Sequence, residues 1–241
     1  MRILIIRHGD PDYVNDCLTE RGKLEAESLA SFLKNEKIDH YYMSPLGRAM
    51  ETASYTLKAK GCEAEICPWL REFHAPIIGD DGNSKITWDW LPGIWTKDEK
   101  YFNKDLWHTT SVMEEGSVFS EAERVWQGLD EILEKHGYKR EDNYYRAEMA
   151  NNDTIALFCH FGVECVMLAH LLNVSPMVLW HGTCALPTSV TTLYTEERRK
   201  GIAYFRMTSF GSIAHLTIDG IEPSFSGRFC ETYDNENERH D

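Results

Sequence analysis

Two histidines and two arginines occupy positions from which distant parts of the chain can meet. Arg7 and His8 end a short apolar run at the start of the chain, and His160 directly follows a later one. Arg48 comes shortly after a third run. Ligands of open α/β sheets bind beyond the carboxyl ends of the strands, so these side chains are expected to line one pocket. Imidazoles can attack or move protons, and guanidinium groups bind oxyanions, which predicts chemistry on an anionic ligand.

The elements that must position these residues follow from the hydrophobic pattern. Apolar and β-branched runs at residues 3–6, 40–43 and 154–159 are typical of strands covered on both faces. Helical spacing separates them, and residues 189–207 predict a hairpin. The alternation indicates an α/β fold: a three-layer sandwich with a mixed, mostly parallel central sheet flanked by helices.

The length of 241 residues predicts a single domain over residues 1–241. Residues 73–116 lack a clear period but hold four of the seven tryptophans, so we expect an inserted aromatic-rich lid there. Residues 139–153 are polar and predict a surface loop. Residues 230–241 carry five acidic groups and one arginine, and are expected to form a frayed acidic tail.

Composition narrows the classes of partner. Acidic residues outnumber Lys and Arg by 39 to 25, and the resulting net charge of −14 argues against nucleic acid and anionic membrane surfaces as partners. Seven cysteines without a Cys-x-x-Cys pair predict reduced thiols and no structural zinc site. The apolar run near the first residue is too short for a signal peptide, so the expected location is cytoplasmic.

Five short segments occur in a fixed order along the chain. They are Arg7-His8-Gly9, residues 18–22 (LTERG), residues 44–53 (SPLGRAMETA), Leu70-Arg71-Glu72 and His160-Phe161-Gly162. This ordered set resembles the histidine phosphatase superfamily, also called the phosphoglycerate-mutase-like family. The resemblance covers both ends of the predicted α/β core and largely omits the aromatic middle segment.

The resemblance implies a phosphomonoester hydrolase that works through a phosphohistidine on His8, with no cofactor and no metal. Arg7 and Arg48 would bind the phosphate through bidentate hydrogen bonds, and their charge would favour neutral His8. His160 would donate a further hydrogen bond to the transferring group. The implied partner is a small phosphorylated substrate, and the oligomeric state stays open.

The proton donor to the leaving oxygen is assigned by the same resemblance. The family pattern often places its acid in a Leu-x-Glu segment, which makes Glu72 the expected general acid. Many relatives continue with a Gly-x-Trp-Glu-Gly-like run, whereas residues 73–76 here are FHAP. Glu114, Glu115 and Asp10 therefore remain alternatives.

Three assignments have competing interpretations. Asn15 is a phosphate contact by resemblance, although the residues before it depart from the common family form. Arg48 could instead pair with Glu51, three residues further along a helix. His160 and Glu164, at helical spacing, could be metal ligands, but no third ligand has suitable local spacing.

Two other functions compete with hydrolysis. A mutase of the same mechanism must also hold the substrate's carboxylate, which favours extra basic groups in the lid. A catalytically silent phospholigand-binding protein could keep the same fold. Hydrolysis is favoured over the mutase because residues 73–116 contain no arginine and only four lysines, at positions 85, 97, 100 and 104.

Overall fold

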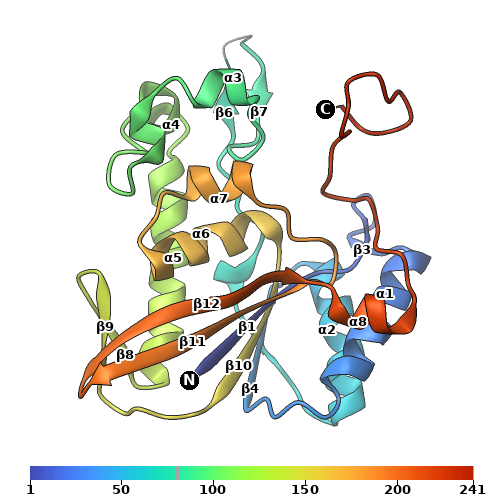
Figure 1. Ribbon diagram of the computed structural model, residues 1–241, viewed down its shortest axis with the longest axis vertical. Coiled ribbons are helices and arrows are strands. Elements are labelled where there is room, and N and C mark those ends of the chain that lie inside the picture. The colour runs from blue at the N-terminus through green and yellow to red at the C-terminus, as the bar shows by residue number, and fades with distance from the viewer. Residues whose placement is uncertain (80–81, 241) are drawn as a thin grey trace.

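A central sheet organises the molecule, of which the computed structural model describes residues 1–79 and 82–240. Asp80 and Asp81 of the expected lid, and Asp241 of the expected tail, lie outside this described part. Eight described strands form the sheet in the order β5-β4-β10-β1-β11-β12-β9-β8 (Figure 1). Their bounds are β1 Arg2–Arg7, β4 His40–Met43, β5 Glu65–Ile66, β8 Tyr138–Glu141, β9 Tyr144–Ala147, β10 Thr154–Cys159, β11 Val190–Arg199 and β12 Ile202–Ser212.

The sheet is mixed, as expected, but its antiparallel part is the larger, in contrast to the mostly parallel sheet that the sequence predicts. Strands β5, β4, β10 and β1 pair in parallel, so their carboxyl ends share one edge. The pairs from β1 through β11, β12 and β9 to β8 are antiparallel. The parallel half therefore carries the predicted strand-end residues, and the long β11–β12 hairpin extends the sheet away from them.

Helices cover both faces of the sheet and confirm the α/β architecture. Helices α1 (Glu20–Leu33), α2 (Gly47–Lys60) and α8 (Ala214–Asp219) lie on one face. The opposite face carries α5 (Val118–Lys135), α6 (Phe161–Leu172) and α7 (Pro176–Gly182) (Figure 1). Alternate residues of β1 join two different hydrophobic clusters: Ile3 and Ile5 face α5 and α6, whereas Leu4 and Ile6 face α1 and α2. Burial on both faces explains the continuous apolar run.

The segment at residues 139–153 is not the loop that its polarity predicts. Strands β8 and β9 form a hairpin that extends the sheet beside β12. Tyr138 and Tyr145 are buried and pack against Phe205, with ring centroids 6.0 and 5.1 Å away. Each of these strands buries only one aromatic side chain, and charged residues lie between the two tyrosines. The sequence therefore does not show the alternation of apolar and polar residues that is typical of a strand.

The aromatic segment at residues 73–116 lies beside the sheet, at the level of α7 and beyond it (Figure 1). Trp107 is fully buried and meets Trp180 of α7 edge to face, with ring centroids 5.8 Å apart. Packing of this kind joins the segment to the main core. Its short elements are β6 Ile77–Ile78, β7 Ser84–Lys85, α3 Pro92–Trp95, the 3-10 helix η2 Glu99–Phe102 and α4 Ser111–Glu115.

Three short elements complete the described part and border the strand ends. Strands β2 (Pro11–Asp12) and β3 (Cys17–Leu18) pair with each other, and the 3-10 helix η1 spans Pro68–Leu70.

All seven cysteines are free thiols. No helix in the described ranges is long and apolar enough to cross a membrane.

Candidate active site

The predicted histidines and arginines converge at the carboxyl edge of the parallel strands. Arg7 is the last residue of β1 and His8 follows it, while His160 stands between β10 and α6. Arg48 lies in the first turn of α2, after β4. All four residues are buried, and the rings of His8 and His160 are 5.0 Å apart between centroids. Residues separated by up to about 150 positions thus share one site.

His8 is held in a form suited to nucleophilic attack. Its Nδ1 lies 2.8 Å from the carbonyl oxygen of Gly9, to which a proton on Nδ1 is donated. This tautomer leaves a lone pair on Nε2. Burial, followed by the positive charge of Arg7, holds the pKa of His8 well below its ordinary value. The imidazole is therefore neutral near pH 7.

His160 is oriented by Ser44, the first residue of the SPLGRAMETA segment. The Ser44 hydroxyl accepts a hydrogen bond from the backbone N–H of Leu46 and lies 2.7 Å from Nε2 of His160. A hydroxyl that donates to Nε2 leaves the proton of His160 on Nδ1. This Nδ1 is buried and has no hydrogen-bond partner among the described residues. His160 therefore offers an unused donor, and burial lowers its pKa, with the positive charges of Arg48 and Arg7 acting in the same direction.

The two guanidinium groups are anchored at one nitrogen and unpaired at another. Arg7 donates from Nη1 to the carbonyl oxygen of Ala185, and Arg48 donates from Nη1 to Oδ1 of Asp16 at 2.5 Å. Nε of each arginine is buried without a partner in the part of the chain that is described. A buried, unpaired N–H costs about 1–3 kcal/mol, so these groups suit an oxyanion that would satisfy them.

Asp16 fixes Arg48, and sequence reasoning missed it. Its carboxylate also accepts a hydrogen bond of 2.7 Å from the backbone N–H of Gly47. Partial burial raises the pKa of Asp16, but these bonds and the charge of Arg48 outweigh it and bring the pKa below the ordinary value. Arg48 does not pair with Glu51, whose carboxylate instead accepts from the backbone N–H of Leu18 at 2.7 Å.

Glu72 follows the 3-10 helix η1 along the chain, and its side chain contacts the first turn of α6. Its Oε1 accepts hydrogen bonds from the backbone N–H groups of Phe73 and Val163, at 2.8 and 3.0 Å. Burial raises the pKa of Glu72, and these bonds and the charge of Arg7 offset only part of that effect. A carboxyl group with a raised pKa is suited to donate a proton.

The alternative acids are placed less favourably. Hydroxyl groups of Thr19, Ser224 and Ser226 all donate to the carboxylate of Asp10. Burial raises the pKa of Asp10, but these bonds outweigh it and leave the pKa below its ordinary value, which keeps the group ionised. Glu114 and Glu115 are exposed on α4. Glu72 is the candidate that the geometry favours.

The side chain of Asn15 is hydrogen-bonded within its own turn. It is exposed, and its Nδ2 donates to Oδ2 of Asp12 at 2.8 Å. Its neighbour Tyr13 lies close to the site instead, with the ring centroid 5.3 Å from the Arg48 guanidinium carbon. The backbone between β2 and β3 thus presents Tyr13, and not Asn15, to the guanidinium.

His160 and Glu164 do not belong to a group of three metal-ligating side chains within the described ranges. Glu164 is buried one turn into α6. Burial raises the pKa of Glu164 to about 7, although the Thr191 hydroxyl and the charge of Arg7 act in the opposite direction. Glu164 is therefore a buried carboxyl group in the helix that follows His160.

Trp88 is a second residue that the sequence pattern missed. Its indole Nε1 is buried without a partner among the described residues. A Cβ added to Gly162 would lie 2.8 Å from both this nitrogen and Oε1 of Glu72. The ring of Trp88 also meets Phe161 edge to face at 5.9 Å. Trp88 and Phe161 thus form an aromatic wall next to Glu72, and only glycine fits at position 162, between Trp88 and Glu72.

The C-terminal segment closes the opposite side of the site. A Cβ on Gly227, whose φ is +93°, would lie 2.5 Å from Nη1 of Arg7. Ser224 and Ser226 bind Asp10, as described above. The exposed Cys184 lies 3.3 Å from the carbonyl oxygen of Gly227. Residues 224–227 therefore cover the guanidinium group of Arg7.

Known proteins with similar sequences include phosphatases and a mutase. Phosphoserine phosphatase 1 of Hydrogenobacter thermophilus is 25% identical over 224 residues, covering 86% of this chain and 93% of that protein. A probable phosphoglycerate mutase of Photorhabdus laumondii is 32% identical over 87 residues, covering 32% of this chain and 40% of that protein.

Solved structures share the fold. A phosphoserine phosphatase variant from Entamoeba histolytica, crystallised with phosphoserine, superposes with a TM-score of 0.62 at 19% identity, over 89% of this chain and 98% of that one. The model of the histidine phosphatase superfamily (branch 1) matches residues 3–208. The chain therefore belongs to the histidine phosphatase superfamily.

Proposed function

We propose that this protein is a phosphomonoester hydrolase that passes the phosphoryl group through Nε2 of His8. The observation that carries the proposal is the set of buried, unpartnered N–H donors around a neutral imidazole: Nε of Arg7, Nε of Arg48 and Nδ1 of His160. A phosphoryl group would satisfy all three donors and neutralise the charge of both arginines. An apolar ligand would leave them unpaired.

In the first half-reaction, Nε2 of His8 attacks phosphorus and the bond from phosphorus to the leaving oxygen breaks. Arg7, Arg48 and His160 hold the equatorial oxygens, where negative charge must be stabilised. Glu72 gives its proton to the leaving oxygen and becomes a carboxylate. The raised pKa of Glu72 supports this step, because the protonated form must be populated before attack.

In the second half-reaction, water replaces His8 at phosphorus. The Glu72 carboxylate takes a proton from this water, the new bond from oxygen to phosphorus forms, and the bond from nitrogen to phosphorus breaks. Inorganic phosphate leaves, His8 is neutral again and Glu72 is protonated again. No further proton donor, metal or cofactor is needed for this balance.

The substrate is a small phosphomonoester, and residues 73–116 act as a lid of a single domain that spans residues 1–241. Similarity to phosphoserine phosphatase 1 along most of the length of that protein supports a substrate about as small as phosphoserine. The aromatic wall of Trp88 and Phe161 supports contact with the organic part of the leaving group. Phosphate transfer within a phosphoglycerate is the competing outcome, because one similar protein is named a probable mutase.

Rapid quenching of the reaction, followed by measurement of acid-labile phosphate bound to the enzyme, tests the mechanism. We expect wild-type enzyme quenched during turnover of labelled substrate to carry acid-labile phosphate, and His8→Asn to carry none and lose turnover. His74→Asn, at an exposed histidine, is the matched control and should behave as wild type. Full activity in His8→Asn together with no labile phosphate in the wild type would exclude the mechanism.

Product analysis separates the competing activities. Hydrolysis predicts inorganic phosphate release from aryl and alkyl monoesters, whereas a mutase predicts interconversion of 2- and 3-phosphoglycerate without phosphate release. Tight binding of vanadate with neither activity would identify a silent phospholigand-binding protein.

A further inference from the structure

Two histidines and an aspartate meet at the opposite edge of the sheet from the proposed active site. His40 begins β4, Asp153 immediately precedes β10, and His136 directly follows α5. Because β4 and β10 are parallel and Ile155 pairs with His40, their amino ends lie together. The seven residue steps from Asp153 to His160 span about 20 Å along an extended strand, so this cluster is well separated from His8.

We propose that His40, His136 and Asp153 bind a divalent transition-metal ion, with Zn²⁺ as the ion to be tested. Each residue offers one ligand atom, and these atoms all lie within 4.8 Å of one another. Two imidazoles and one carboxylate are donors that suit zinc, whereas Mg²⁺ and Ca²⁺ prefer oxygen ligands alone.

The separations are close to those a bound ion requires. Zinc bonds of about 2.0–2.2 Å place tetrahedral ligand atoms about 3.3 Å apart, so no pair of ligand atoms needs to approach by more than about 1.5 Å. The ring centroids of His40 and His136 lie 4.6 Å apart, with an angle of 67° between the ring planes. His40 is exposed at the first position of its strand, where its side chain is free to make this adjustment.

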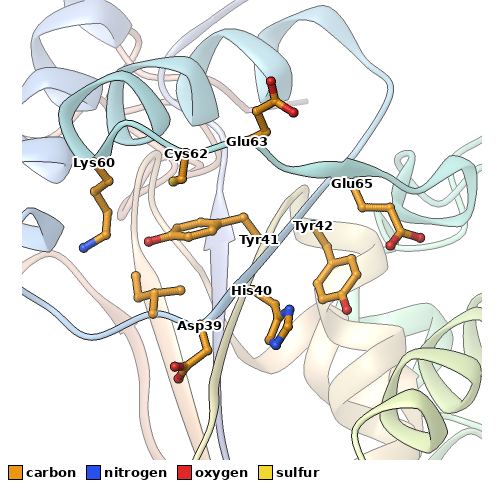
Figure 2. A pocket seen from close by; sticks show the side chains of 9 residues that line it. Asp39, His40, Tyr41, Tyr42, Lys60, Cys62, Glu63 and Glu65 are labelled. Atoms are coloured by element: carbon orange, nitrogen blue, oxygen red, sulfur yellow. The ribbon is translucent and has the colours of Figure 1, made fainter.

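The buried histidine has the support that metal ligands use. The Tyr42 hydroxyl lies 2.9 Å from Nε2 of His136, which leaves Nδ1 as the nitrogen for the ion. A ligating histidine usually gives its other N–H to such a partner, which fixes its tautomer and ring orientation. Figure 2 shows the side chains of His40 and Tyr42 on the same side of β4, and Tyr41 pointing the other way.

Asn151 links the other two segments of the cluster. Its Nδ2 donates to the carbonyl oxygen of His136 at 2.8 Å, and its Oδ1 accepts from the backbone N–H of Asp153 at 3.0 Å. An open pocket of about 520 Å³ borders all three proposed ligands and gives an ion access from solvent. Water can therefore take the remaining coordination position.

Neighbouring charges are largely engaged elsewhere. The Asp39 carboxylate accepts from the backbone N–H of Thr154 at 2.8 Å and pairs with Lys37 at 3.1 Å. Lys135, the nearest cation on α5, pairs with Glu65 at 3.3 Å. Asp153 thus supplies the negative charge that would face the ion.

Metal titration of the full chain tests the proposal. After treatment with EDTA and dialysis, we expect the wild type to bind one Zn²⁺ per chain by calorimetry, and saturating zinc to raise the melting temperature by about 5 °C. His40→Ala and Asp153→Asn should each weaken binding at least tenfold. His240→Ala, at an exposed histidine of the tail, is the matched control and should bind as wild type.

Spectroscopy identifies the ligands. Bound Co²⁺ should give visible bands of nitrogen and oxygen coordination without a sulfur charge-transfer band, which distinguishes the cluster from the seven free cysteines. Circular dichroism checks that both variants fold. Absence of stoichiometric zinc in the wild type, equal binding in His40→Ala, or a sulfur band would each overturn the proposal. Phosphatase activity should not change in His40→Ala, so this outcome is independent of the proposed mechanism.

Discussion

At the scale of single residues, the site contains converging side chains and a second set of residues that hold them in place. Arg7, His8, Arg48 and His160 were predictable because each lies at or just after a strand end, where local pattern and position coincide. Asp16 was not, since its role depends on a contact with a residue 32 positions away. Ser44 likewise acts across 116 positions. Residues that orient others leave no local pattern, because their partners are set by the fold.

Glu72→Gln tests the assignment of the general acid. Because glutamine cannot donate a proton to the leaving oxygen, kcat should fall about 100-fold or more for alkyl monoesters with poor leaving groups. It should fall much less for aryl phosphates with good leaving groups. The measurement is kcat against the pKa of the leaving alcohol. Glu114→Gln, on exposed α4, is the control and should keep the wild-type slope. An equal loss for every leaving group would contradict the assignment.

The pH dependence provides a second check on the same residue. The raised pKa of Glu72 and the lowered pKa of His8 both widen the pH range in which neutral His8 and protonated Glu72 coexist. We expect kcat/KM to fall on the alkaline side as Glu72 loses its proton. The alkaline limb should vanish in Glu72→Gln when an aryl phosphate is the substrate. Persistence of this limb would assign it to another group.

At the scale of elements, the proposed role of Glu72 depends on the backbone geometry at the start of α6. Gly162→Ala would place a Cβ 2.8 Å from Oε1 of Glu72 and from Nε1 of Trp88, so one or both must shift. Displacement by about 1 Å can cost 100-fold in rate, and we expect kcat to fall about 10- to 100-fold. Gly182→Ala, whose Cβ would meet nothing within 4 Å, is the control. Equal activity in the two variants would contradict the coupling.

Helix α6 also carries the buried carboxyl of Glu164, whose pKa is raised to about 7. Between pH 4.5 and 7 the folded protein keeps a proton that the unfolded chain has released, so stability falls as pH rises through this window. Glu164→Gln should therefore gain unfolding free energy relative to wild type from pH 5 to pH 8, by at most about 3 kcal/mol. Urea unfolding at both pH values measures this gain, with the exposed Glu115→Gln as the control. A gain that does not change with pH would contradict the buried proton.

The elements themselves were predictable where periodicity was strong. Thr19 caps α1 by accepting from the backbone N–H of Gly22 at 3.1 Å, and threonine is a residue type that favours this position. Strands β8 and β9 were missed because each buries only one tyrosine between charged residues. A strand that extends a sheet through backbone hydrogen bonds needs few apolar side chains, so composition alone does not reveal it.

At the scale of the whole molecule, a net charge of −14 surrounds a site built for an anion. Raising the ionic strength from 0.01 to 0.15 M shortens the Debye length from about 30 to 8 Å and screens this long-range repulsion. We expect kcat/KM for a dianionic monoester to rise over this range, and inhibition by tripolyphosphate to strengthen more steeply. Sodium acetate in place of chloride controls for halide binding. A fall in kcat/KM in both salts would show that the local positive field dominates at the entrance.

The placement of residues 224–227 gives the chain a functional boundary that differs from its family boundary. Similarity to the family model ends at residue 208, yet two serines and a glycine beyond it bind Asp10 and cover Arg7. A protein shortened to the matched region would keep every residue that the mechanism names and open Arg7 to water. Truncations and C-terminal fusions should therefore begin after residue 228, because the residues that cover Arg7 lie outside the segment by which the family is recognised.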